Sequence, residues 1–239
     1  MPSMNPRGKS RAVVVTFSGI DGAGKSTLIE RLRARLQQEG RRVLLLSFWD
    51  DVAVLQRFRE FASCNLLGGD AGVGTPEKPV QRRDKNVQSR FMTAARLVMY
   101  LLDAARLRTV VAAARAAGAE VIFFDRYLYD EVANLPLRRS FACAYARLLL
   151  RLAPKPELAC LVDADPLVAQ RRKPEYPLDF LRHNRDSYLK VRELTRHMTL
   201  ISPTGPEEGA AVLQLLLEKL RTLSGTSPME PPARPAGGS

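Results

Sequence analysis

Histidine, cysteine and tryptophan are scarce in this chain of 239 residues, which has two, three and one of them, respectively. The two histidines, His183 and His197, are not spaced as metal ligands, and the sequence therefore argues against a zinc site. The cysteines, Cys64, Cys143 and Cys160, are odd in number, widely spaced and set in apolar surroundings. This usage is typical of small core residues in a reducing compartment rather than of disulfides or a metal set.

Long apolar runs are also absent, and none approaches the roughly 18 residues that span a bilayer. Residues 1–11 are basic, but the apolar stretch after them is too short for a signal-peptide core. We therefore expect a cytoplasmic protein with no membrane partner. The length suits one α/β domain over residues 12–223, with a flexible N-terminus over 1–11 and a disordered Pro/Gly/Ser-rich tail over 224–239.

Acidic residues are fewer than basic ones, 25 against 37, which gives a formal net charge of +12. Such a charge suits a nucleic acid or a polyanionic small substrate, or reflects arginines spread over helix surfaces. No basic stripe with interleaved aromatic residues is present. We therefore favour the second and third explanations and expect no nucleic-acid partner.

One glycine-rich segment carries the strongest functional signal. A β-branched run, VVVTF, is followed by Gly-x-x-x-x-Gly-Lys-Ser from Gly19 to Ser26 and then by a helical pattern. A strand, a glycine turn and a helix N-terminus in this order form a phosphate-binding loop, whose backbone N–H groups and helix dipole face an anion. Lys25 adds a cation for the β- and γ-phosphates, and the Ser26 hydroxyl suits Mg²⁺. We expect ATP to bind at Gly19, Asp21, Gly22, Ala23, Gly24, Lys25, Ser26 and Thr27.

Hydrophobic patterning predicts strands that alternate with helices, which indicates a parallel sheet with ligands at the carboxyl ends of its strands. Strands are expected over residues 13–17, 43–48, 121–124, 158–162 and 198–201. Helices are expected over 25–39, 87–117, 128–135, 138–152, 166–173, 178–196 and 206–223, with a short helix after Asp51 to about residue 61. Residues 67–86 form a long irregular stretch, of a kind that is usually functional or mobile.

Two further groups of residues suit phosphate chemistry. Asp125 ends the strand VIFFD, where its carboxylate can hold Mg²⁺ or its waters beside Ser26, and Arg126 can bind phosphate oxygens. The alternative for Asp125 is a helix cap. Arg171 and Arg172, with Lys173, form a cationic patch that can neutralise a transferring phosphoryl group. The alternative for this patch is a solvated helix end whose cations complement the helix dipole.

Three segments in this order and spacing resemble the thymidylate kinase family of nucleoside monophosphate kinases. They are GIDGAGKSTL, FFDRYLYDEVAN, and LVDADPLVAQRR followed by FLRHNRDSYLKV, and the resemblance covers about residues 13–223. It implies a three-layer α/β/α P-loop NTPase fold with a five-stranded parallel sheet in the order 2-3-1-4-5 and a short lid at about 168–178. It also implies ATP, Mg²⁺, a small-molecule nucleotide acceptor and a homodimer.

By position, the resemblance implies roles for individual residues. Lys25 and Ser26 would hold the donor phosphates and Mg²⁺, and Asp125 would join Ser26 at the metal. Asp21 and Arg106 would lie near the acceptor nucleotide, and Arg126 would bind the acceptor phosphate. The family places a catalytic arginine in the phosphate loop or in the lid, and because the loop position is Gly22 here, Arg171 or Arg172 would supply it.

The acceptor half of the site departs from the family pattern. Phe48-Trp49-Asp50-Asp51 replaces the usual Arg-Glu-Pro-Gly turn, and Asp130, with Ala133-Asn134-Leu135, replaces a Ser…Ala-Tyr-Gln motif. A hydroxyl acceptor needs a base, and Asp50 or Asp51 could act as one. A phosphate acceptor instead needs cations. The nearby basic residues that could supply them are Arg82, Arg83, Lys85 and Arg90. The acidic pair could also simply mark a helix N-terminus.

The leading hypothesis is ATP- and Mg²⁺-dependent phosphoryl transfer to a nucleoside monophosphate, with dTMP converted to dTDP, catalysed by Lys25, Arg126, Arg171, Arg172 and Asp21. Asp50, Arg106, Asp125 and Arg126 would bind the acceptor. The runner-up is a kinase of a nucleoside or another small hydroxyl compound. A third possibility is a nucleotide-binding protein without turnover, although the chain lacks an Asn-Lys-x-Asp guanine motif.

Overall fold

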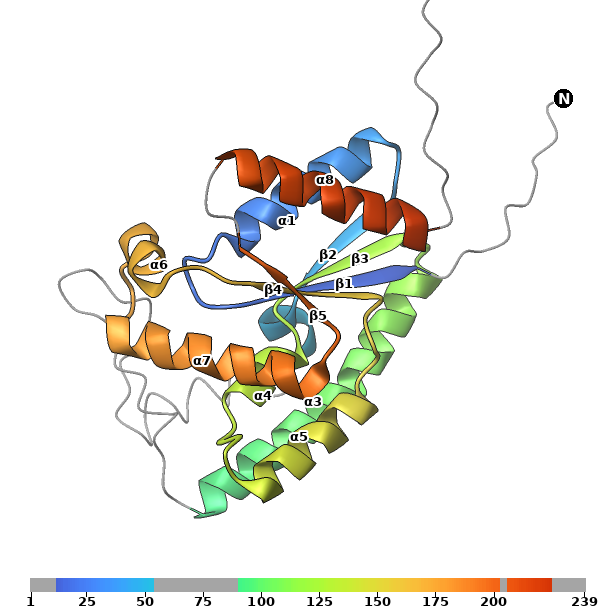
Figure 1. Ribbon diagram of the computed structural model, residues 1–239. Coiled ribbons are helices and arrows are strands. Elements are labelled where there is room, and N and C mark those ends of the chain that lie inside the picture. The colour runs from blue at the N-terminus through green and yellow to red at the C-terminus, as the bar shows by residue number, and fades with distance from the viewer. Residues whose placement is uncertain (1–11, 54–89, 203–205, 225–239) are drawn as a thin grey trace, which may run out of the picture.

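The computed structural model describes residues 12–53, 90–202 and 206–224 (Figure 1). The expectations for 1–11, for the tail beyond residue 224 and for the long stretch at 67–86 lie outside these ranges. So do most of the short helix expected after Asp51 and the residues Cys64, Arg82, Arg83 and Lys85. Arg90 begins a helix, but its side chain is not described.

Five parallel strands form the central sheet in the order β2-β3-β1-β4-β5, as predicted. The strands are β1 (Val13–Ser18), β2 (Val43–Ser47), β3 (Val121–Asp125), β4 (Leu158–Val162) and β5 (Met198–Ile201). Strands β1, β3 and β4 are buried along almost their whole length, which explains their continuous apolar sequences. In the sheet register, Asp125 lies opposite both Phe17 and Ser47, so its side chain is placed at the carboxyl edge between β1 and β2.

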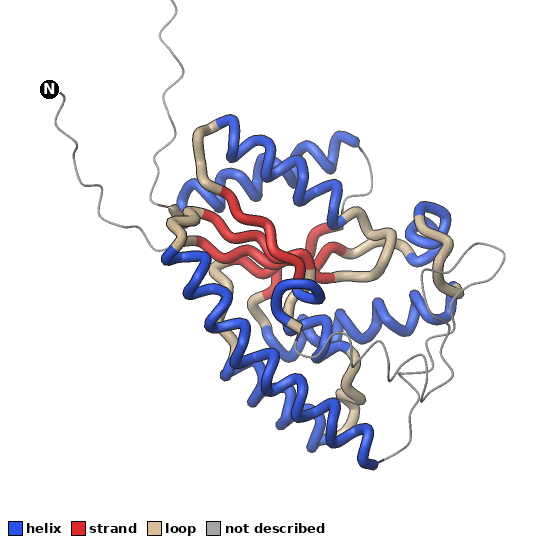
Figure 2. Tube along the Cα trace, turned by 180° about the vertical axis from the view of Figure 1, so that it is seen from behind, coloured by secondary structure: helices blue, strands red, loops and turns tan. Residues whose placement is uncertain are grey.

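Helices cover both faces of the sheet, which gives three layers (Figures 1 and 2). On one face α1 (Lys25–Gln38) packs beside α8 (Pro206–Leu223). The other face carries α3 (Arg90–Ala116), α4 (Leu128–Ala133), α5 (Ser140–Leu152) and α7 (Leu178–Thr195). The short α6 (Pro166–Arg172) lies beyond the carboxyl edge, near the start of α1, and packs against α7. This is the predicted P-loop α/β fold.

The end of β2 differs from the prediction. The strand stops at Ser47, and Phe48–Val52 forms η1, one turn of π-helix, closed by a hydrogen bond from the Ala53 N–H to the Phe48 carbonyl (2.8 Å). The Asp51 carboxylate accepts from the Ser47 N–H (2.7 Å), which turns the chain out of the sheet. Phe48 is fully buried. A buried apolar residue suits a strand or a turn equally well, so the sequence does not show where the pairing of β2 with β3 ends.

The other boundaries that lie within the described residues agree to within two residues, and the largest differences are the end of α4 at Ala133 and the start of α5 at Ser140. The expected start of the helix over 87–117 lies outside the described ranges. Cys160 is fully buried in β4, as expected for a small core residue, and burial raises the pKa of its thiol to about 12. Over the described ranges, the helices are too short or too polar for any of them to cross a membrane.

Candidate active site

The phosphate loop connects β1 to α1 at the carboxyl edge of the sheet. The side chain of Lys25 folds back over the loop, where its Nζ donates to the carbonyls of Gly19 and Ile20, both at 2.9 Å. Burial, and after it the charge of Arg126, lowers the pKa of Lys25 to about 8. A cation held at reduced pKa against two carbonyl oxygens is well placed to exchange them for phosphate oxygens.

Gly22 of the phosphate loop lies against α6. Its φ of +81° suits glycine, and a Cβ there would lie 2.8 Å from the carbonyl carbon of Ala169 and 3.0 Å from its Cα. The backbone of α6 therefore lies directly on the phosphate loop. No other residue type fits at position 22 without moving one of the two segments.

Arg172 is the predicted lid arginine that the geometry brings to the loop. Its Nη1 lies 3.9 Å from the place where a Cβ on Gly24 would be, beside the N-terminus of α1. Arg171 is also exposed near the end of α6. Neighbouring residues on a helix point about 100° apart, so the two side chains leave α6 in different directions.

Asp125 offers a carboxylate oxygen that suits a metal ion. Its Oδ1 is buried and has no hydrogen-bond partner, and burial raises the pKa of this carboxyl. In the described ranges no group of three or more His, Cys, Asp or Glu side chains could hold a metal alone. Mg²⁺ commonly binds through one or two protein groups together with nucleotide phosphates. Oδ1 of Asp125, which has no hydrogen-bond partner, and the hydroxyl group of the exposed Ser26 fit that arrangement.

Arg126 stands between two carboxylates. Its Nη2 donates to Asp21 in the phosphate loop, and its Nη1 donates to Asp130 at 3.2 Å. Burial acts to lower the pKa of Arg126, but Tyr188, Asp130 and Asp21 outweigh it and raise the pKa, so the guanidinium keeps its charge. The structure thus gathers Asp21, Lys25, Asp125 and Arg126, which come from two separate stretches of the sequence, at one edge of the sheet.

Two polar contacts fix the segments on either side of α6. Arg185 of α7 forms a two-pronged ion pair with Asp163, with Nε to Oδ1 at 2.6 Å and Nη2 to Oδ2 at 2.7 Å. Gln170 donates to the Tyr176 carbonyl at 3.1 Å. The first contact joins the carboxyl end of β4 to α7, and the second joins α6 to the segment that leads into α7.

Two predicted acceptor residues are not joined to this group. Arg106 is exposed on α3, and no contact among the described residues links it to the loop, to Asp125 or to Arg126. Asp50 is exposed in η1 at the carboxyl end of β2, whereas its neighbour Asp51 is engaged with the Ser47 N–H. The helix-terminus explanation therefore accounts for Asp51, and the role of Asp50 stays a prediction.

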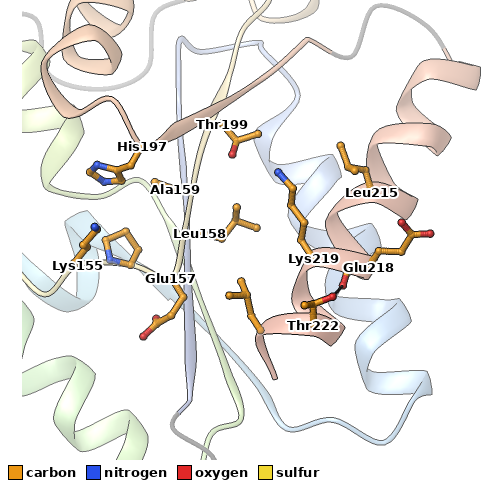
Figure 3. Close-up of a pocket in the computed structure, with 12 residues that line it drawn as sticks. Lys155, Glu157, Leu158, Ala159, His197, Thr199, Leu215, Glu218, Lys219 and Thr222 are labelled. Atoms are coloured by element: carbon orange, nitrogen blue, oxygen red, sulfur yellow. Dashed lines mark hydrogen bonds between the residues drawn. The ribbon is translucent and has the colours of Figure 1, made fainter. Parts of the chain in front are cut away.

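A pocket of about 600 Å³ lies elsewhere, between the start of β4, β5 and the C-terminal half of α8 (Figure 3). Leu158 and Ala159 line it at the amino end of β4, opposite to the edge that carries the phosphate loop. Its charged side chains are of both signs, with Lys155 and Lys219 near Glu157 and Glu218. We assign this pocket no part in phosphate chemistry.

The fold and the glycine loop together define a P-loop nucleotide-binding protein. A family profile described as methylmalonyl Co-A mutase-associated GTPase MeaB, another P-loop family, matches residues 4–50. The thymidylate kinase of Solidesulfovibrio magneticus is 30% identical over 162 residues, 66% of this chain and 67% of the relative. The probable thymidylate kinase of Pyrococcus abyssi is 26% identical over 202 residues, 80% and 88% of the two chains. That of Pyrobaculum aerophilum is 25% identical over 214 residues, 86% and 96%. The chain belongs to the thymidylate kinase family.

Proposed function

We propose that this protein transfers the γ-phosphoryl group of ATP to a nucleoside monophosphate, with dTMP as the acceptor and dTDP as the product. The observation that carries the proposal is the meeting of the Lys25 ammonium, the Arg126 guanidinium and the Asp125 carboxylate at the phosphate loop. One relative named thymidylate kinase and two named probable thymidylate kinase, which align over most of this chain, support the choice of acceptor.

Each residue has a separate task in this proposal. The N–H groups of the loop and Lys25 hold the β- and γ-phosphates of ATP, and Arg126 holds the acceptor phosphate. Arg172 reaches over the start of α1 to neutralise the charge that develops on the transferring group. Ser26 and Asp125 would hold Mg²⁺, directly or through water, and the ion would supply positive charge to the phosphates of ATP. An ionised phosphate acceptor needs no base, which agrees with a site that presents cations to it.

A turnover assay with ATP, Mg²⁺ and a panel of nucleoside monophosphates tests the proposal. We expect ADP release coupled to formation of the corresponding diphosphate, highest with dTMP, and no product with Lys25→Ala. If ATP binds but no monophosphate is phosphorylated, the proposal is wrong.

A second candidate is phosphorylation of a nucleoside or another small hydroxyl compound. Exposed Asp50 at the carboxyl end of β2 favours it, because a hydroxyl acceptor needs a carboxylate base. Since Asp51 is occupied by Ser47, Asp50 is the base in this candidate. Asp50→Asn would then abolish turnover of a nucleoside, whereas Asp51→Asn would chiefly lower stability.

A further inference from the structure

A buried carboxylate beside the site has no role in the family pattern, which has serine at this position. Asp130 lies in the first turn of α4 and is 3% exposed, so it is largely shielded from solvent. An ionised carboxylate in such a place is costly unless donors surround it. Asp130 meets this need with contacts to several different parts of the fold.

Four groups donate to the two oxygens of Asp130. Oδ2 accepts from the hydroxyl of Ser18 at the end of β1 (2.7 Å) and from the N–H of Tyr127 (3.0 Å). Oδ1 accepts from the hydroxyl of Tyr188 on α7 (2.6 Å) and from Nη1 of Arg126 (3.2 Å). Oδ2 therefore contacts β1 and the start of α4, whereas Oδ1 contacts α7 and Arg126.

Arg126 itself is held in a strained conformation. Its φ is +67°, which costs a residue with a side chain roughly 1–2 kcal/mol. Its N–H donates to the carbonyl of Phe17 at 2.9 Å, which fixes the backbone. The guanidinium is fixed separately, by Asp21 on one nitrogen and Asp130 on the other.

The two carboxylates that hold Arg126 are not equivalent. The side chain of Asp21 is 19% exposed and belongs to the loop that receives the nucleotide, whereas that of Asp130 is 2% exposed and tied to three other groups. An incoming phosphate can compete with Asp21 for the guanidinium, but it cannot reach Asp130 without unpacking α4. Asp130 is thus the constant partner of Arg126 and Asp21 is the exchangeable one.

We propose that Asp130 is a positioning residue, which anchors one nitrogen of Arg126 so that the rest of the guanidinium points at the acceptor phosphate. An arginine has five N–H donors, and one bond to Asp130 leaves the others for a ligand. A single anchored nitrogen converts a flexible side chain into an oriented one before the acceptor binds. The part that concerns the acceptor rests on the proposed function.

The substitution Asp130→Asn isolates this task. An amide oxygen in the place of Oδ2 still accepts from Ser18 and from the Tyr127 N–H. An amide nitrogen in the place of Oδ1 can donate to the hydroxyl of Tyr188, which rotates to accept. It cannot bond to Arg126, because both groups are hydrogen-bond donors and the guanidinium has no acceptor. The variant thus keeps three of the four contacts and removes the one to Arg126.

Steady-state kinetics of Asp130→Asn is the first test. We expect the KM for the nucleoside monophosphate to rise on the order of tenfold, the effect of one lost charge-assisted hydrogen bond, while the KM for ATP stays within about twofold. Tyr188→Phe is the matched control, because it removes a bond to the same oxygen but none from Arg126. Asp179→Asn makes the same chemical change at an exposed ion pair with Arg182. Both controls should keep the wild-type KM values.

Crystal structures of wild type and Asp130→Asn test the positioning directly and need no activity. We expect the Arg126 guanidinium to leave its place in the variant, with α4 unchanged. An unmoved Arg126, or an acceptor KM raised equally by Tyr188→Phe, overturns the proposal. If the wild type phosphorylates no monophosphate, the proposed function fails, and the two crystal structures still decide whether Asp130 positions Arg126.

Discussion

Replacing Gly22 with alanine should uncouple α6 from the phosphate loop. Carbon atoms in contact lie about 3.5–4.0 Å apart, whereas the new Cβ would lie 2.8 Å from the carbonyl carbon of Ala169. The backbone of α6 must therefore retreat by about 1 Å. Arg172 lies on the same short helix and retreats with it. A misplacement of about 1 Å at a reacting group can lower a rate by on the order of a hundredfold.

The same substitution also introduces backbone strain, which has to be separated from the effect on α6. A residue with a side chain at φ +81° costs roughly 1–2 kcal/mol. For a chain of this size that corresponds to a Tm lower by about 2–8 °C. Gly40→Ala is the matched control, because Gly40 has φ +75° and no atom within 4 Å of a Cβ placed there.

Turnover, ATP binding and thermal unfolding of the two variants would be measured side by side. We expect similar losses of Tm in both, and a fall of about a hundredfold in kcat for Gly22→Ala alone. Equal activity in the two variants would refute the reasoning, because it would mean that the contact between the loop and α6 has no bearing on the chemistry.

Three further predictions concern the cations of the site. Lys25→Ala should abolish turnover without lowering the Tm at pH 7. The pKa of Lys25 is about 8 in the folded protein and 10.5 in the unfolded chain, so below pH 8 the charge of this side chain opposes folding. A clear loss of thermal stability at pH 7 would contradict this prediction. Arg172→Ala should lower kcat by on the order of 10³-fold and Arg171→Ala by much less, and the reverse ranking in a kinetic comparison would show that Arg171 faces the phosphates. ATP binding at pH 8 should take up about half a proton, since phosphates raise the pKa of Lys25, and almost none at pH 6.5; calorimetry in buffers of different ionisation enthalpy measures this uptake, which should vanish in Lys25→Ala.

Local sequence was enough to predict the sheet and the phosphate loop. The strand before Gly19 and the helix after Ser26 each carry their own pattern, and Asp125 ends a short apolar run that is typical of a buried strand. The strands and the loop depend on residues close together in the chain, where patterning is informative. The order of the strands was instead implied by the resemblance to the thymidylate kinase family, and it is the observed order.

Contacts between distant residues could not be predicted in this way. Asp130 attracted notice only as a departure from a family motif, and its bonds to Ser18 and Tyr188 cross 112 and 58 positions. The approach of Gly22 to Ala169 likewise depends on how α6 packs, which no short pattern records. The end of β2 was misjudged because Phe48 is equally apolar in a strand or in the turn of π-helix that it begins.

The ion pair of Arg185 with Asp163 limits how α6 can move relative to the sheet. It joins α7 to the residue that follows β4, so both ends of the segment that contains α6 are anchored to the fold. A swing of α6 must then be taken up by a few bonds at Ala164 and Asp165 on one side and between Lys173 and Pro177 on the other. Under the proposed function, exchange of the donor nucleotide would therefore involve small local movements of α6 rather than rotation of a separate lid domain.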